Sequence, residues 1–264
     1  MKALASALSA VCLLSVACLA GSLEMSIGAG PSVVSLDALN ETIGVYNQWI
    51  DELNGYFEVH PDVTGSIELL ETIGTSLSFS AAERYRLTSW FALGATIDYT
   101  RSASETRGFY QGTEASEIAI GLSFQAIDVA LGGTLTFLDV GLQLGITAGV
   151  GYHHAIVDKS VVFEIPEEYP YVIAGLPPSE GGRYTGGTFG FDIGLSLAYP
   201  IAPWFSVGTD VVYRSAQIAS LVDASAVALD LDGDGTAEPI SLSGLMVRFS
   251  FTISINLSLD GEKE

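Results

Sequence analysis

The chain has 264 residues and a formal net charge of −21, from 31 acidic and 10 basic side chains. Its mean hydropathy is nevertheless positive, at +0.41. This charge argues against nucleic acid as a partner, since a polyanion would be repelled, and the length allows one domain or two small ones.

The N-terminal segment, residues 1–20, has the pattern of a secretory signal peptide. A basic residue at position 2 precedes an apolar run that ends in small residues. A retained membrane anchor is the alternative, but the run is short and lacks flanking charge. Cys12 and Cys18 both lie in this segment, so we expect a mature chain, 21–264, without disulfides or thiolate metal sites. The residues before Cys18 also resemble a bacterial lipoprotein cleavage box, which would make Cys18 a lipid-attachment site.

The first mature segment, 23–34, alternates apolar and polar residues, and this period of two predicts a β-strand. From residue 36 the apolar residues recur instead at spacings of three and four. This spacing predicts an amphipathic helix over 36–57, within a long connection at 35–69, with Ser35 as its N-cap. The connection carries acidic residues and no Lys or Arg between positions 35 and 65.

Seven further ranges show the period of two that predicts strands. In one of them the apolar residues change parity near Gly132-Gly133, which we interpret as a β-bulge or glycine kink. The last range alternates over more than the roughly 9–11 residues that a tilted membrane-crossing strand needs. The seven ranges are 73–86, 91–100, 118–137, 140–153, 189–199, 205–213 and 245–259.

The eight predicted strands are joined by long and short connections in strict alternation. Apolar residues cover one face of every strand, while Gly, Ser and Thr dominate the other face. In hydrocarbon a sheet must close on itself, because an unpaired edge has no water to bind. We therefore predict an all-β fold, an eight-stranded antiparallel up-and-down transmembrane β-barrel with one amphipathic helix in its first long loop. The long connections would be 35–69, 102–116, 156–185 and 215–240.

Aromatic residues recur at the same spacing in two turn-and-strand units, one beginning at Tyr85 and one at Tyr199. Each unit has aromatic residues at both ends of an outward apolar band, as membrane-interface girdles require. Two similar hairpins of a soluble barrel are the alternative. The predicted interface aromatics are Trp90, Phe91, Tyr99, Tyr199, Trp204, Phe205 and Tyr213.

With these features the chain resembles the small outer-membrane barrels of bacteria, of the OmpA transmembrane-domain and OmpX type. The resemblance covers about residues 22–259 and rests on the alternation and the rhythm of the loops. It implies a single barrel domain in the outer membrane, with both termini on the periplasmic side. Members of this family usually end on an aromatic residue, whereas this chain ends its last strand on Leu257-Ser-Leu259.

Charged residues on the inward faces of the strands would lie inside the barrel, where they must be paired or hydrated. One interpretation is a salt-bridged polar core that blocks the lumen. The alternative is a narrow pore for small solutes or ions, gated by Arg–carboxylate pairs. The predicted lumen residues are Glu24, Arg84, Arg86, Asp98, Asp192, Asp210, Arg214 and Arg248.

Four acidic residues in the last long loop match the start of a calcium loop: Asp230, Asp232, Asp234 and Glu238. The twelfth position would need Glu and is Ser241, and the segment leads into a strand. Calcium is the cofactor that this pattern suggests, and an acidic solvated turn is the alternative.

We expect a non-enzymatic protein with a structural or surface-interaction role. The expected partners are outer-membrane lipid, divalent cations at the acidic external loops, or a partner protein. The apolar stripe of helix 36–57 must be buried, in the barrel mouth, on the outer leaflet or against such a partner. A remote alternative is a lipid-modifying enzyme, for which the candidate groups are His60, His153, His154, Asp158 and Ser160.

Overall fold

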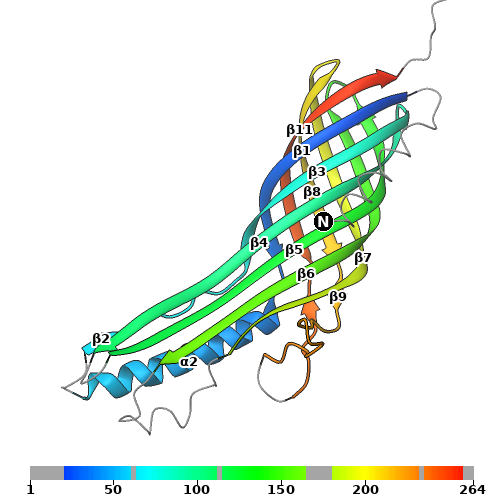
Figure 1. Ribbon diagram of the computed structural model, residues 1–264. Coiled ribbons are helices and arrows are strands. Elements are labelled where there is room, and N and C mark those ends of the chain that lie inside the picture. The colour runs from blue at the N-terminus through cyan, green and yellow to red at the C-terminus, as the bar shows by residue number, and fades with distance from the viewer. Residues whose placement is uncertain (1–20, 61–63, 112–114, 165–179, 232–234, 258–264) are drawn as a thin grey trace, which may run out of the picture.

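The structure is a computed structural model. It describes residues 21–60, 64–111, 115–164, 180–231 and 235–257 (Figure 1). The predicted signal peptide, with Cys12 and Cys18, lies outside the described residues. No helix in these ranges is both long and apolar enough to cross a membrane.

Eight long antiparallel strands form a closed ring, in which the first and last strands pair from Gly21↔Leu257 onward. The predicted eight-stranded barrel is therefore confirmed. Going round the ring, the strands are β1 (Gly21–Val34), β3 (Thr75–Thr88), β4 (Phe91–Gln111), β5 (Ala115–Asp139), β6 (Gln143–Glu164), β7 (Glu180–Ala202), β8 (Phe205–Ser215) and β11 (Gly244–Leu257).

The described parts of the connections contain one helix, α2 (Asp37–Glu58), and three short strands. The short strands are β2 (Thr64–Ser66), which adds to the outer end of β4, and the pair β9 (Gln217–Ile218) and β10 (Ile240–Ser241). Tight turns join β3 to β4, β5 to β6, and β7 to β8 at one end of the barrel, as predicted. Each of these three hairpins has a register shift beside its turn, before Thr88, before the Leu138↔Leu144 pair and before Ala202.

Strands β4 to β7 continue far beyond the barrel, toward the lower left of Figure 1. β4 and β5 pair without a break from Phe91↔Leu135 to Gln111↔Ala115. At about 3.3 Å per residue, the 25 residues of β5 extend for about 80 Å. The predicted loops at 102–116 and 156–185 are therefore wrong over their described residues, which are strand. We call the projecting part the arm; it comprises α2 and residues 64–74, 102–111, 115–124, 155–164 and 180–186.

Helix α2 packs on the inner face of the arm. Its apolar stripe is almost fully buried and forms one cluster with β5 residues such as Ile118 and Leu122. The ring of Phe57 stacks on that of Tyr110, with centroids 4.2 Å apart. The predicted helix is confirmed, and its stripe is covered by the chain itself. Leu36 is the N-cap and makes no side-chain cap bond, so the predicted Ser35 cap is wrong; the Ser35 hydroxyl donates to Asp37 instead.

The same face of β5 points inward along its whole length, but its surroundings change. Asp128 and Ala130 face the lumen, whereas Leu122 and Phe124 on the same face lie under the apolar cluster. Outward residues such as Leu131 and Leu135 are exposed, as a lipid-facing surface requires. The pairing runs through Gly132-Gly133 without a shift. The predicted bulge there is wrong, because the apolar residues change sides where the strand leaves the membrane.

Three asparagines of α2 hold an extended segment, residues 67–73, which we call the strap. Asn40, Asn47 and Asn54 each accept from a strap N–H and donate to the C=O of the same residue, at distances of 2.7–3.0 Å. The strap partners are Ile73, Leu70 and Ile67 in that order. Seven helical residues rise about 10.5 Å and three extended residues about 10 Å, so the two spacings match.

Candidate functional site: the charged lumen

Arg214 on β8 is the centre of a buried charge network inside the barrel. Its Nε and Nη2 donate to the two carboxylate oxygens of Asp192, each at 3.0 Å. Nη2 also donates to Asp98 Oδ2 at 2.9 Å, and Nη1 donates to Asp128. One guanidinium thus joins strands β4, β5, β7 and β8, and its planar fork suits several carboxylates at once.

Two further side chains extend this network to β6 and β11. Arg248 Nη1 lies 3.4 Å from Asp98 Oδ1, and His153 Nδ1 lies 3.0 Å from Asp128 Oδ1. All of these groups except Asp192 are nearly inaccessible to solvent. Charges removed from water in this way are tolerated when each finds an opposite charge. The network therefore fixes six of the eight barrel strands to one another.

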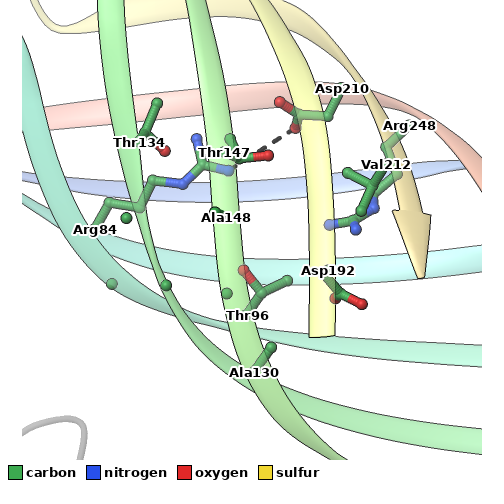
Figure 2. Close-up of a pocket in the computed structure, with 14 residues that line it drawn as sticks. Arg84, Thr96, Ala130, Thr134, Thr147, Ala148, Asp192, Asp210, Val212 and Arg248 are labelled. Atoms are coloured by element: carbon green, nitrogen blue, oxygen red, sulfur yellow. Dashed lines mark ion pairs between the residues drawn. The ribbon is translucent and has the colours of Figure 1, made fainter. Parts of the chain in front are cut away.

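A second set of charges lies closer to the tight turns. Figure 2 shows Arg84 of β3 reaching across the lumen toward Asp210 of β8, with 3.9 Å between Nη2 and Oδ2. Arg86 pairs with Glu24 through Nε and Oε1, 2.6 Å apart. A cavity of about 60 Å³ lies between Arg84 and Arg248. A larger cavity of about 220 Å³ is lined by Glu24, Arg84, Arg86 and polar residues of the strand ends, including Ser22, Gln143 and Asn256.

Beyond the Arg214 network, toward the arm, the lumen becomes apolar. Phe124, Leu242 and Met246, together with Asp128 and Arg214 of the network, line a gap of about 10 Å³, a volume for no more than one water. The connection between β8 and β11 buries further apolar side chains in the same cluster as α2, among them Ile218 and Leu221. Going from the tight turns toward the arm, the lumen is thus closed by the Arg214 network and then by apolar packing.

The structure places all eight sequence-predicted lumen residues inside the barrel, although in two separate layers. Asp98, Asp192, Arg214 and Arg248 meet in one layer, and Glu24, Arg84, Arg86 and Asp210 lie in the other. Sequence reasoning missed Asp128. The signal was available, since Asp128 shares its parity with Ala130 and Gly132, but the assumed bulge assigned the wrong side of the strand inward.

The aromatic residues that the sequence placed at the membrane interfaces lie on the outer surface. Trp90 with Phe91 and Trp204 with Phe205 form two similar ring pairs at the tight turns, with centroids 5.8 and 5.7 Å apart. Tyr199 and Tyr213 are exposed, at 56% and 47%. Tyr99 is half-buried, and its hydroxyl lies 3.5 Å from Gln125 Oε1.

The calcium motif is only partly within the described residues, because Asp232 and Asp234 lie outside them. The carboxylate of Asp230 accepts from the Gly235 N–H at 2.8 Å, and that of Glu238 accepts from the Leu231 N–H at 2.9 Å. Within the described ranges no group of three or more His, Cys, Asp or Glu side chains could hold a metal. Calcium binding here stays a prediction.

The candidate catalytic groups lie apart from one another in the described part of the chain. His153 is buried in the lumen beside Asp128, whereas Ser160 is exposed on β6. Asp158 lies 3.8 Å from Arg183, and His60 Nδ1 lies 2.6 Å from the Tyr56 carbonyl oxygen. These positions do not assemble a nucleophile, a base and an orienting acid.

A closed antiparallel barrel with an apolar exterior and a charged interior belongs to the class of outer-membrane-type transmembrane β-barrels. No protein-family model matches the sequence, and no curated protein matches it.

The chain is similar to solved structures of small outer-membrane proteins. They include OprG from Pseudomonas aeruginosa (TM-score 0.49, 10% identity, 90% of this chain and 98% of that chain). Ail of Yersinia pestis (0.46, 12%, 90% and 100%) and Neisserial surface protein A (0.42, 11%, 88% and 96%) are two others. At these values the assignment rests on the strand pairing of the chain itself.

Proposed function

We propose that the protein is a closed barrel of the bacterial outer membrane, whose function is to hold the arm outside the cell as an interaction surface. The arm carries this proposal, because it is the part of the molecule that is built well beyond what a membrane anchor needs. Its strands continue past the lipid-facing band, and α2 and the strap give it a packed core of its own.

The outer side of α2 and the strap supplies the chemistry of the proposed interaction. Seven exposed carboxylates lie there, and residues 35–74 contain no Lys or Arg. Such a surface attracts divalent cations or a basic partner protein by long-range electrostatics. The acidic residues are Asp37, Glu41, Asp51, Glu52, Glu58, Glu68 and Glu71.

Surface labelling tests the location of the arm. The chain has no cysteine after residue 18, so single cysteines can be introduced cleanly. In intact Gram-negative cells, a membrane-impermeant maleimide is expected to label Gln48→Cys on the exposed side of α2. Pro203→Cys, in a tight turn, is the matched control and should react only after the outer membrane is opened. Labelling of both variants, or of Pro203→Cys alone, in intact cells would contradict the proposed orientation.

A narrow pore is the second candidate, favoured by the two cavities of about 60 and 220 Å³ in the lumen. The charge network and the apolar closure argue against it, since an ion would need to displace both. In planar bilayers we expect no discrete current steps from the purified protein, with a porin in a separate bilayer of the same lipid as the positive control. Reproducible steps that disappear when the protein is omitted would favour the pore.

A further inference from the structure

Arg101 differs from the six other arginines that the structure describes. Each of those has a carboxylate oxygen within 4 Å. Arg101 is exposed on β4 and has no such partner among the described residues, in a chain with 31 acidic and 10 basic side chains. Its guanidinium is therefore available for an anion from outside the protein.

Arg101 lies at the arm-side rim of the lipid-facing surface. It is ten residues from Phe91, which stands at the opposite rim, and both side chains point outward by the alternation of β4. Ten residues cover about 33 Å along a strand, or about 25 Å along the barrel axis at a tilt of about 40°. This matches the height of the apolar band of such barrels, about 25 Å. Arg101 is thus at the level of the lipid headgroups.

The neighbours of Arg101 offer donors and no competing carboxylate. Leu77 and Gln125 lie directly across from it on β3 and β5. Gln125 Oε1 accepts from the Tyr99 hydroxyl, which leaves the two amide hydrogens of Gln125 for another acceptor. A guanidinium beside a free amide fits an oxyanion with several acceptor oxygens.

We propose that Arg101, with Gln125 beside it, binds the phosphate of a lipid headgroup in the outer leaflet. Phosphate is the anion that a membrane presents at this depth, and a guanidinium binds it in a bidentate manner. The strongly negative chain repels anionic lipid elsewhere, so this contact sets where such a lipid sits against the barrel. The inference rests on the membrane location proposed above.

The test uses full-length mature protein in phosphatidylcholine bilayers with increasing fractions of phosphatidic acid. Anionic lipid is expected to raise the thermal midpoint of the wild type, measured by the change in gel mobility on heating. In Arg101→Gln the apparent affinity for phosphatidic acid should fall about tenfold, the size of one charged hydrogen bond. Arg101→Lys should lie between the two, because it keeps the charge without the planar fork.

Arg107→Gln is the matched control, and it should keep the wild-type response. Arg107 lies on the same face of the same strand, about 15 Å further from the membrane, and pairs with Glu117 at 2.6 Å.

Equal affinities for wild type and Arg101→Gln, or an equal loss in Arg107→Gln, would overturn the site. Competition by inorganic phosphate at matched concentration would overturn the lipid as its occupant. If Arg101→Gln does not insert, Arg101→Lys and Gln125→Leu decide, and wild-type affinity in both overturns the proposal. Failure of the wild type to insert into phosphatidylcholine alone would instead count against the barrel location.

Discussion

Among single residues, Arg214 is expected to contribute most to the stability of the barrel. Its side chain is 5% exposed and contacts three carboxylates. Removing one partner of a buried ion pair leaves the other charge without its partner. Among the described residues, Asp192 would lose its arginine, and Asp98 and Asp128 would keep only Arg248 and His153. We expect Arg214→Ala to lower the free energy of unfolding by about 3–5 kcal/mol, measured by urea titration in lipid vesicles.

The control for this prediction is Arg107→Ala, which removes an exposed ion pair. Its side chain is 62% exposed, so the loss should stay below about 1 kcal/mol. A small loss in both variants would show that the network does not stabilise the barrel.

At the residue scale the sequence predicted most of the lumen and missed its centre of charge. Period-two alternation assigns a side to Asp98, Asp192 and Arg214 without any tertiary knowledge. Alternation fails for Asp128 because the outer face of β5 cannot be identified by apolar residues alone. The apolar residues of β5 face outward where the strand lies beside lipid and inward where it lies beneath α2. The polarity of a residue therefore does not tell which way its side chain points.

At the scale of elements, the strap is the least regular part of the arm, and its attachment depends on the asparagines of α2. Asn47 holds the middle of the strap through two hydrogen bonds with Leu70. We expect Asn47→Ala to lower the free energy of opening of the strap by about 1–3 kcal/mol, because the N–H and C=O of Leu70 lose their hydrogen-bond partners. Hydrogen exchange should be faster at residues 67–73 and unchanged in β8 and β11.

Gln48→Ala is the matched control on the next residue of the helix. The Gln48 side chain is exposed and bonds only to Glu52 of the same helix, at 3.2 Å, among the described contacts. Its exchange pattern should equal that of the wild type. Faster exchange of the strap in both variants would point to loss of helix stability rather than loss of the asparagine bonds.

The elements of the arm could be predicted only in part. The stripe of α2 and its limits follow from spacing alone, and the helix is where the sequence placed it. The extensions of the strands into the arm could not be predicted in this way, because residues such as Ser104, Glu105 and Thr106 are polar and are typical of a loop. The asparagine contacts join residues 13 to 33 positions apart, and no local pattern reports such contacts.

At the scale of the whole molecule, the centre of the barrel is held by its charge network and the arm by the apolar cluster around α2. We therefore expect the two parts to unfold separately. Burial raises the pKa of Tyr110, in the arm, to about 12, from 10.0. Because the folded pKa is the higher one, the Tyr110 contribution is complete below pH 10 and is lost as the pH rises toward 12. Hydrogen exchange of α2 should therefore accelerate over this range while the gel mobility of the barrel stays unchanged.

Tyr110→Phe separates this effect from general alkaline unfolding. The variant loses the 2.6 Å bond from the Tyr110 hydroxyl to Asn54, so its arm starts less stable, but the step assigned to Tyr110 should be absent. If the step persists in Tyr110→Phe, another group is responsible.

The matched spacing of α2 and the strap gives the arm a fixed increment of length. Adding one more asparagine that binds the strap requires seven further residues in the helix and three in the strap. Either insertion lengthens its segment by about 10 Å. Each strand of the arm would need about three further residues to gain the same length. Insertion of a single residue into α2 between Asn40 and Asn54 would rotate the later asparagines by about 100° and detach them. Related arms of other lengths should therefore differ by whole increments, and a designed arm can be extended in the same steps.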